Sequence, residues 1–151
     1  MALNSLISSR VSKGICVSVT ISWCSVMGWR DFDINSSKII LPFDFVKKGD
    51  LIFDIGKKSA EKFSEIISKA KTIVWSGPMG KFEEKEYEEG TRIITEAVQE
   101  SSAYKIIGGG DTISAVSKFG NLDKFNHIST GGGAMLEFLG GKKLPGIEAL
   151  K

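Results

Sequence analysis

The chain has 151 residues, a length that fits one domain, and its 42% hydrophobic and 25% charged residues are typical of a globular protein. A net charge of +2 at pH 7, with no block of Lys and Arg, argues against a nucleic acid partner. The apolar stretch near the N-terminus is too short and too rich in serine to span a bilayer, so we expect no membrane partner. The two cysteines, Cys16 and Cys24, are too far apart on a strand to form a disulfide, and no CxxC motif indicates a metal site. We therefore expect a reducing compartment and a cytoplasmic location.

Residues 1–37 form an N-terminal segment whose role the sequence leaves open. Residues 1–30 contain seven serines and no Asp or Glu, a bias that also occurs in transit peptides. Apolar and small polar residues alternate over residues 15–24, however, which is the period of a strand. Three interpretations follow: an added or poorly ordered segment, an extra strand, or a targeting segment. We expect residues 1–30 to be dispensable for the stability of the core, because they do not share the pattern that follows.

Strand and helix patterns alternate from residue 38 onward. Their periodicity predicts strands at residues 38–45, 51–54, 72–75, 104–107 and 125–129, and helices at residues 59–71, 87–101, 111–119 and 131–139. No sequence repeat or low-complexity linker interrupts them. The alternation predicts an α/β domain over residues 38–151, with a Rossmann-like, mostly parallel sheet and helices on both faces.

Individual side chains add detail to this prediction. Ser59 is the expected N-cap of the first helix, and Gly120 is expected to close the third. Trp75 is expected to be a core residue, and His127 a buried or edge histidine rather than a catalytic base. The residues expected to face the core from the first two helices are Phe63, Ile66, Ile67, Ala70, Tyr87, Ile94 and Val98.

Three glycine clusters follow predicted strands: GPMG at 77–80, GGGD at 108–111 and TGGG at 130–133. Parallel strands would bring all three to one edge of the sheet, where open α/β sheets bind ligands. Two clusters open directly into helices, whose free N–H groups attract anions, and glycine lets phosphate oxygens approach the backbone. The clusters therefore predict phosphate binding, the alternative being tight turns required by packing.

The clusters do not match the better-known nucleotide motifs. None has the spacing of a P-loop, and none completes GxGxxG, which argues against a Rossmann-type oxidoreductase. Asp111 follows the second cluster and has two interpretations. It is either the N-cap of its helix or a carboxylate beside a phosphate, suited to holding Mg²⁺.

The segments VWSGPMGKFE, IIGGGDTISAV and HISTGGGAMLEFLGGKKLPGIEAL, preceded by KIILPFDF and DIGKKSAEKF, resemble the closing part of the phosphoglycerate kinase family. The resemblance covers roughly residues 38–151. It implies the nucleotide-binding, C-terminal domain of a two-domain kinase of glycolysis. Such a kinase uses Mg²⁺ and exchanges a phosphoryl group between 1,3-bisphosphoglycerate and ADP, giving 3-phosphoglycerate and ATP.

The resemblance also implies roles for individual residues. The GPMG loop and a glutamate after it would contact the ribose and base, and the GGGDT segment would contact the phosphates, with its aspartate near the metal. The start of the last helix would hold the phosphoryl group in transfer. The implied nucleotide-binding residues are Gly77, Pro78, Glu83, Gly109, Gly110, Asp111 and Thr112, the implied catalytic residues are Gly131, Gly132 and Gly133, and the implied metal ligand is Asp111.

This sequence departs from the family pattern at several points. Ser76 stands where the family usually has Asn, and Lys81 where it has an aliphatic residue. Both positions are expected to line the nucleotide site. The family's N-terminal substrate domain, with its basic pocket and catalytic arginine, has no counterpart in residues 1–37. Two functions follow: a truncated or remodelled phosphoglycerate kinase, or a non-catalytic nucleotide-binding module or remnant. We expect the isolated chain to be inactive. The missing N-terminal domain is a candidate partner, and the sequence leaves open whether a companion chain supplies it.

Overall fold

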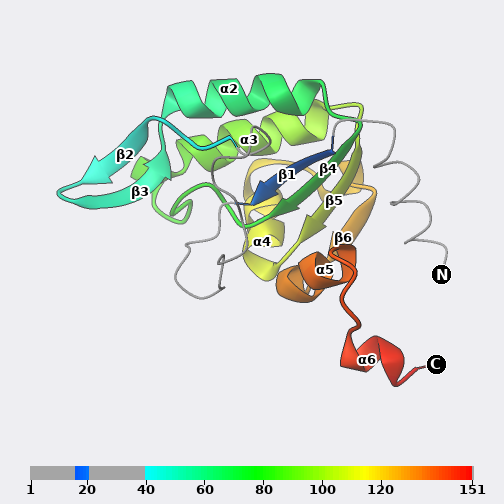
Figure 1. Ribbon diagram of the computed structural model, residues 1–151. Coiled ribbons are helices and arrows are strands. Elements are labelled where there is room, and N and C mark those ends of the chain that lie inside the picture. Colours follow the sequence, from blue (N-terminus) through cyan, green and yellow to red (C-terminus); the bar gives the residue numbers. More distant parts are fainter. Residues whose placement is uncertain (1–15, 21–39, 151) are drawn as a thin grey trace.

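Four parallel strands form the main sheet of this protein (Figure 1). The computed structural model describes residues 16–20 and 40–150. The elements in these ranges are, in chain order, β1 (Cys16–Thr20), β2 (Phe45–Lys48), β3 (Leu51–Ile55), α2 (Lys57–Ser68), β4 (Thr72–Ser76), η1 (Lys85–Tyr87), α3 (Glu89–Glu100), β5 (Tyr104–Gly108), α4 (Gly110–Phe119), η2 (Leu122–Lys124), β6 (His127–Ser129), α5 (Gly132–Leu139) and α6 (Pro145–Glu148). Among them, no helix has the length and apolar character needed to cross a bilayer.

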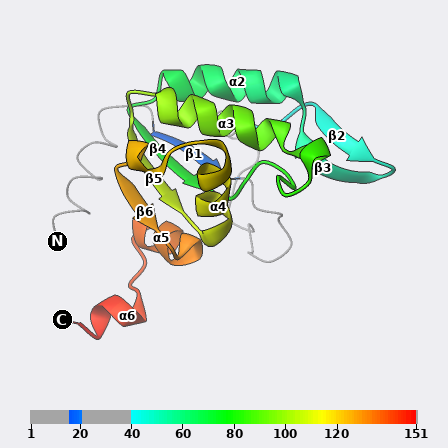
Figure 2. The same cartoon turned by 180° about the vertical axis from the view of Figure 1, so that it is seen from behind.

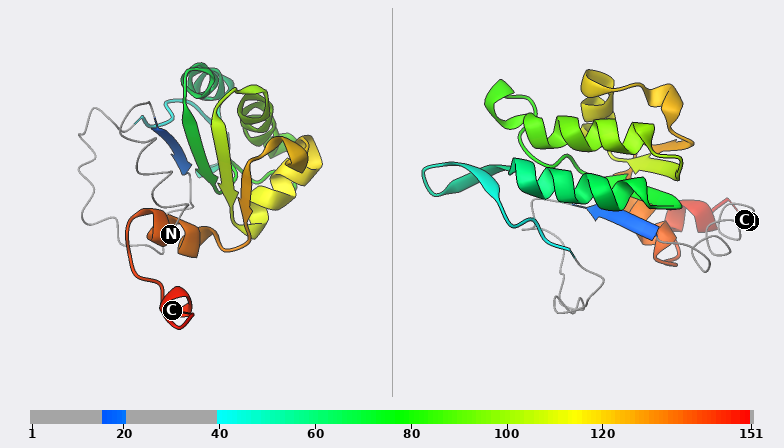
Figure 3. Two further views of the ribbon diagram at one scale, coloured as in Figure 1. Left: turned by 90° about the vertical axis from the view of Figure 1, so that its right-hand side faces the viewer. Right: turned by 90° about the horizontal axis from the view of Figure 1, so that it is seen from above.

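The main sheet has the strand order β1-β4-β5-β6, and each neighbouring pair is parallel. Helices α2, α3 and α4 cover one face and α5 lies on the other, as the left view of Figure 3 shows. Four of the five residues of β4 are buried, because the strand is covered on both faces. The predicted α/β class, with a parallel sheet and helices on both faces, is confirmed.

The larger part of the core lies between the sheet and helices α2, α3 and α4. Trp75 is fully buried there, and its indole N–H donates to the carbonyl of Gly77 at 2.7 Å, so its predicted core position is confirmed. A smaller cluster joins the other face of the sheet to α5. The predicted core residues of the first two helices are buried, apart from the half-buried Ile66; they are Phe63, Ile67, Ala70, Tyr87, Ile94 and Val98.

The antiparallel strands β2 and β3 form a separate two-stranded sheet that projects beyond the N-terminal end of α2 (Figure 2). The strand predicted at 51–54 is confirmed as β3, but the one predicted at 38–45 is wrong in extent, since residues 40–44 lie outside any strand. Pro42 has no N–H to donate to a neighbouring strand. The N–H groups of Phe43 and Asp44 donate instead to the Ser59 hydroxyl, at 2.9 and 3.0 Å.

The start of α2 is capped by a residue that lies far from it in the sequence. Gly56 precedes the helix and offers no side-chain cap, so the prediction of Ser59 as N-cap is wrong. The Asp44 carboxylate accepts from the backbone N–H groups of Lys58 and Ser59, at 3.1 and 2.7 Å. A hydrogen bond from the Ser59 hydroxyl, with help from these N–H groups, holds the pKa of Asp44 below its usual value. This contact fastens the 40–44 segment to α2.

Residues 16–20 form an edge strand of the main sheet. β1 runs parallel to β4 in continuous register, from the Cys16–Thr72 pair to the Thr20–Ser76 pair. Of the three interpretations of the N-terminal segment, the extra strand is therefore confirmed for these residues, and the other residues before 40 lie outside the described ranges. This pairing argues against the expectation that residues 1–30 are dispensable for the core, because β4 has a backbone partner among them.

We expect a chain that begins at residue 21 to be less stable than one that begins at residue 16. Removing β1 leaves one side of the β4 backbone without its ladder partner, and unpaired buried peptide groups are costly. The melting temperature should fall by roughly 10 °C, measured by circular dichroism on both chains. Equal melting temperatures would show that the β1–β4 pairing contributes nothing to stability.

Candidate functional site

The carboxyl ends of three strands lie side by side at one edge of the main sheet. Ser76 of β4 pairs with Gly108 of β5, which pairs in turn with Ser129 of β6. A glycine cluster follows each of Ser76 and Ser129, another begins at Gly108, and α4 and α5 begin at the same edge (Figure 1). The structure thus brings the three clusters together, as their positions after parallel strands predicted.

The hydroxyl of Thr112 ties two of these loops to each other. It donates to the carbonyl of Gly108 at 2.8 Å and accepts from the N–H of Gly77 at 2.7 Å. The third loop joins through the N–H of Gly109, which donates to the Ser129 carbonyl at 3.0 Å. Because Thr112 is fully buried and its hydroxyl is engaged on both sides, the geometry gives this side chain a role in positioning the loops. The nucleotide contact that the resemblance implies for Thr112 stays a prediction.

Gly132 is required by packing. A Cβ at this position would lie 2.9 Å from Ser76 Oγ, 3.1 Å from Gly109 Cα and 3.2 Å from the Gly108 carbonyl oxygen. The absence of a side chain at Gly132 therefore lets α5 begin directly against the ends of β4 and β5. At Gly132, and likewise at Gly80 and Gly108, where a Cβ would lie 2.3 Å from Asp54 Oδ1 and 2.4 Å from Met135 Cε, packing accounts for the absence of a side chain.

Other glycines of the clusters are not required by packing. A Cβ at Gly110 or Gly133 would meet no atom within 4 Å, and one at Gly131 would meet only the Ala134 side chain at 3.6 Å. Gly110 is the first residue of α4, Gly131 immediately precedes α5, and Gly133 is its second residue. Glycine destabilises a helix relative to alanine, so the fold alone does not account for bare backbone at Gly110 and Gly133.

Asp111 lies in the first turn of α4 but does not cap it. Gly109 occupies the N-cap position and no side chain caps the helix, so the N-cap interpretation of Asp111 is wrong. Its carboxylate is exposed, and no hydrogen bond or ion pair within residues 40–150 engages it. The described residues contain no group of three or more His, Cys, Asp or Glu able to hold a metal by themselves. A single carboxylate fits Mg²⁺ that is also bound by phosphate oxygens and water.

The backbone of loop 77–84 is held by the strand and helix behind it. The N–H groups of Met79 and Gly80 donate to the Thr91 hydroxyl at 3.1 and 3.3 Å. The N–H of Lys81 donates to the Phe53 carbonyl at 2.8 Å. The path of this loop is therefore set by β3 and by the first turn of α3.

Two residues assigned to the nucleotide by resemblance lie on this loop. Pro78 is half-buried beside Gly77, whose φ of 94° favours glycine, and Glu83 is exposed. Phe82, between them, is buried, and its carbonyl accepts from the ammonium of Lys118 at 2.7 Å. The carboxylate of Glu83 thus extends from a fixed backbone into solvent.

Lys81 and Ser76 are the two positions near loop 77–84 at which this sequence differs from the family pattern, and they lie in different surroundings. The exposed ammonium of Lys81 pairs with Glu84, a contact that raises the pKa of Lys81, and it lies 5.9 Å from the ring centre of Phe53. Ser76 is half-buried at the end of β4, where its hydroxyl lies over the backbone of Gly132. The positive charge of Lys81 is therefore already compensated by a neighbouring carboxylate.

Asp54 of β3 is a buried carboxylate behind loop 77–84, and sequence reasoning missed it. The residue is 1% exposed; its Oδ1 accepts from the N–H of Ile55 at 2.8 Å and its Oδ2 from the N–H of Gly90 at 2.7 Å. Burial raises the pKa of Asp54 to about 6, against the lowering effect of these hydrogen bonds, and nearby Glu89 raises it further. One aspartate in a short strand pattern carries no signal that distinguishes it from a surface residue.

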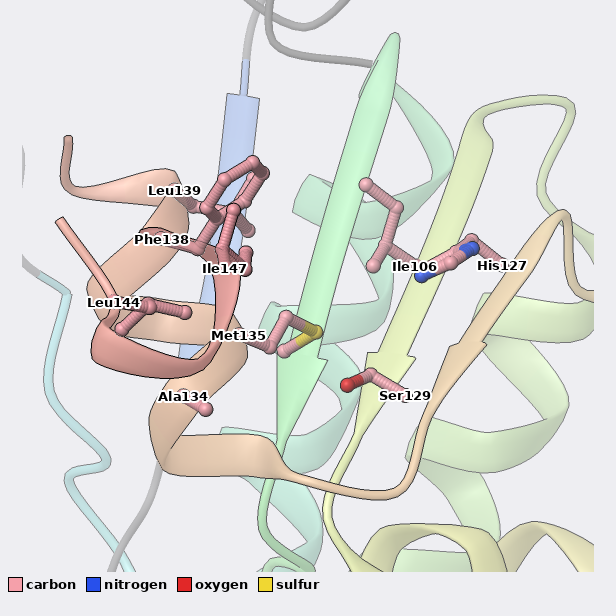
Figure 4. Close-up of a pocket in the computed structure, with 9 residues that line it drawn as sticks. All are labelled: Ile106, His127, Ser129, Ala134, Met135, Phe138, Leu139, Leu144 and Ile147. Atoms are coloured by element: carbon pink, nitrogen blue, oxygen red, sulfur yellow. The ribbon is translucent and has the colours of Figure 1, made fainter. Parts of the chain in front are cut away.

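An apolar groove of about 350 Å³ lies on the other face of the sheet, beside α5 (Figure 4). Met135 and Phe138 of α5 line it together with Leu144 and Ile147 near the C-terminal end. His127, exposed on strand β6, is part of its wall, which agrees with the predicted edge position. No cluster glycine lines this groove, but Ser129 and Ala134, on either side of the cluster at 130–133, do.

Comparison with known proteins identifies relatives of this chain. The family model described as phosphoglycerate kinase matches residues 12–142. The solved phosphoglycerate kinase from Coxiella burnetii is 47% identical with a TM-score of 0.60, over 66% of this chain and 26% of that protein. The enzyme from Pyrococcus horikoshii OT3 is 48% identical with a TM-score of 0.60, over 66% and 24%. This chain thus spans about a quarter of their length, and the family match includes β1, earlier than the resemblance from residue 38.

We expect alanine to have opposite effects at two adjacent glycines. Gly132→Ala should lower the free energy of unfolding by about 1–3 kcal/mol, because the new Cβ overlaps the ends of β4 and β5. Gly133→Ala should leave it unchanged or raise it by up to about 1 kcal/mol, since alanine favours the helix and meets no neighbour. Urea unfolding of both variants measures this. Equal effects would show that the two glycines do not differ as described.

We expect Asp54 to make stability depend on pH. The pKa of Asp54 is raised from 3.8 to about 6 in the folded chain, so ionisation destabilises the fold above pH 6, and this cost is relieved as pH falls towards 4. Relative to Asp54→Asn, the wild type should therefore gain up to about 3 kcal/mol of unfolding free energy between pH 7 and pH 4. Urea unfolding of both proteins at each pH isolates this effect from other carboxylates. Parallel pH profiles would contradict it.

Proposed function

Because this chain belongs to the phosphoglycerate kinase family, we propose that it binds MgADP or MgATP at the carboxyl edge of its main sheet. In this proposal it supplies the nucleotide side of a phosphoryl transfer from 1,3-bisphosphoglycerate to ADP. The observation that carries the proposal is the open space at Gly110, Gly131 and Gly133, at the starts of two helices that begin at the same edge.

The helix starts supply hydrogen-bond donors for phosphate. The first intrahelical bond of α4 runs from the Ile113 N–H to the Gly109 carbonyl at 3.1 Å, and that of α5 from the Met135 N–H to the Gly131 carbonyl at 2.9 Å. The N–H groups of residues 110, 111 and 132–134, none of which is buried as Thr112 is, therefore have no intrahelical acceptor. Together with the positive end of each helix dipole, they favour anionic oxygens.

The arrangement of the loops supports an orientation for the nucleotide. In this proposal the start of α4 binds the nucleotide phosphates, and the start of α5 binds the phosphoryl group in transfer. Loop 77–84 is joined to the start of α4 by the Gly77–Thr112 hydrogen bond, so the ribose and base lie along this loop, with Glu83 towards the ribose. Mg²⁺ would be held by Asp111 with phosphate oxygens and water, and would neutralise charge on the phosphates.

A non-catalytic nucleotide-binding module is the second candidate function, and one observation favours it. Transfer from an acyl phosphate needs fixed cationic side chains around the phosphoryl oxygens. Arg92 is the only arginine in the described ranges, and its guanidinium is engaged by Glu89 and Glu96 on the exposed face of α3. The phosphoglycerate site therefore belongs, in the proposal, to a further domain or chain. We place the complete reaction, a step of glycolysis, in the cytoplasm.

Nucleotide binding tests the proposal directly. We expect calorimetry to show binding of MgADP or MgATP by the chain at millimolar ligand or below. Gly133→Val should weaken this binding at least about tenfold, because a branched side chain occupies the space where phosphate approaches. Gly146→Val is the matched control, since a Cβ there also meets no atom within 4 Å, but in α6. A folded wild-type chain that binds no nucleotide would overturn the proposal.

We expect negligible kinase turnover from this chain alone. A coupled assay with 1,3-bisphosphoglycerate and MgADP should remain at background, because the described residues place no uncompensated arginine at the glycine loops. Addition of the N-terminal domain of a relative as a separate polypeptide should restore some activity. Turnover of roughly 1–100 per second from the chain alone would contradict this expectation and favour a complete catalytic site.

A further inference from the structure

Asp54 lies where three parts of the structure meet behind loop 77–84. It belongs to β3, and its carboxylate receives the N–H of Gly90 in the first turn of α3. The next residue of that helix, Thr91, receives the N–H groups of Met79 and Gly80 through its hydroxyl. A short path of hydrogen bonds therefore runs from the carboxylate, through the start of α3, to the backbone of the loop.

Direct packing strengthens this path. A Cβ at Gly80 would lie 2.3 Å from Asp54 Oδ1, and a Cβ at Gly90 would lie 2.4 Å from the same atom. Both backbones thus pass against the carboxylate at a distance that only glycine permits. Thr91 is fully buried as well, like Asp54. Water therefore does not compete for the hydrogen bonds that these two side chains accept in the folded chain.

Burying the Asp54 carboxylate lowers the stability of the fold, a cost that packing at this position does not require. An apolar side chain in β3 would be buried without the desolvation that raises the pKa of Asp54. Of its two backbone donors, Ile55 belongs to β3 and Gly90 to α3. The hydrogen bond from Gly90 fixes the relative position of β3 and α3 more tightly than apolar contact, because hydrogen bonds are directional. Because residues 79–81 are hydrogen-bonded to β3 and α3, their position depends on this arrangement. They belong to the loop along which the proposal places the ribose and base.

We propose that Asp54 is a positioning residue for the nucleoside end of the bound nucleotide, acting through Gly90 and Thr91 to fix loop 77–84. The inference rests on the proposed function, in which this loop lies along the ribose and base while the helix starts bind the phosphates. It follows that Asp54 governs recognition of the nucleoside and leaves recognition of the phosphates unaffected.

The test separates these two parts of the ligand. The wild type, Asp54→Asn and Thr91→Val are each titrated by calorimetry with MgADP and with magnesium tripolyphosphate, which has no nucleoside. Asp123→Asn, a carboxylate-to-amide change at an exposed position in η2, is the matched control. We expect both variants to bind MgADP about tenfold more weakly than the wild type and the control do, and tripolyphosphate within about twofold of the wild type.

Each other outcome overturns the inference. If both variants prefer MgADP to tripolyphosphate by the same factor as the wild type, the nucleoside is still recognised. Asp54 then does not position the loop. Equal losses for both ligands would mean that Asp54 only supports the fold. Thr91→Val, which is close to isosteric, keeps the path testable if Asp54→Asn does not fold. A folded wild type that binds neither ligand overturns the proposed function itself, a result distinct from the first two.

Discussion

Thr112 uses one hydroxyl group twice, and the geometry of the whole glycine edge depends on it. By donating to Gly108 and accepting from Gly77, it sets the distance between the loop after β4 and the turn after β5. α4 begins at that turn, and α5 begins against the same backbone because Gly132 has no side chain. Two helix starts and one loop are therefore held together by a single buried side chain and one missing Cβ.

The sequence predicted the parts of the fold whose information is local. Strands β4 and β5 and helices α3 and α4 follow strong apolar periods, and the glycine clusters mark where the strands end. Contacts between distant residues were not predictable in this way. Asp44 caps a helix 14 residues further on, and Asp54 accepts from Gly90 36 residues further on. A short polar residue in a strand pattern has the same sequence signal whether it is exposed or buried against another element.

The glycines of the clusters show why composition alone gives an incomplete account of a site. Gly109 adopts a φ of 98° and Gly132 fills a contact, so both are explained by the backbone around them. Gly110 and Gly133 have open space and ordinary conformations, and each weakens a helix relative to alanine. Only coordinates separate the two kinds, since all four stand in uninterrupted glycine runs. The second kind is the one that points to a ligand.

The position of β1 has a consequence for the order in which the chain assembles. Its first residue, Cys16, pairs with Thr72, 56 positions further on, whereas Thr72 and Tyr104 are 32 apart and Ile106 and His127 are 21 apart. Closing a longer loop costs more chain entropy before any contact compensates for it. Strand β1 is synthesised before the other strands of the main sheet. Its partner β4 is synthesised only after β2, β3 and α2. We infer that the β4–β5–β6 unit folds earlier and that β1 docks onto its open edge late.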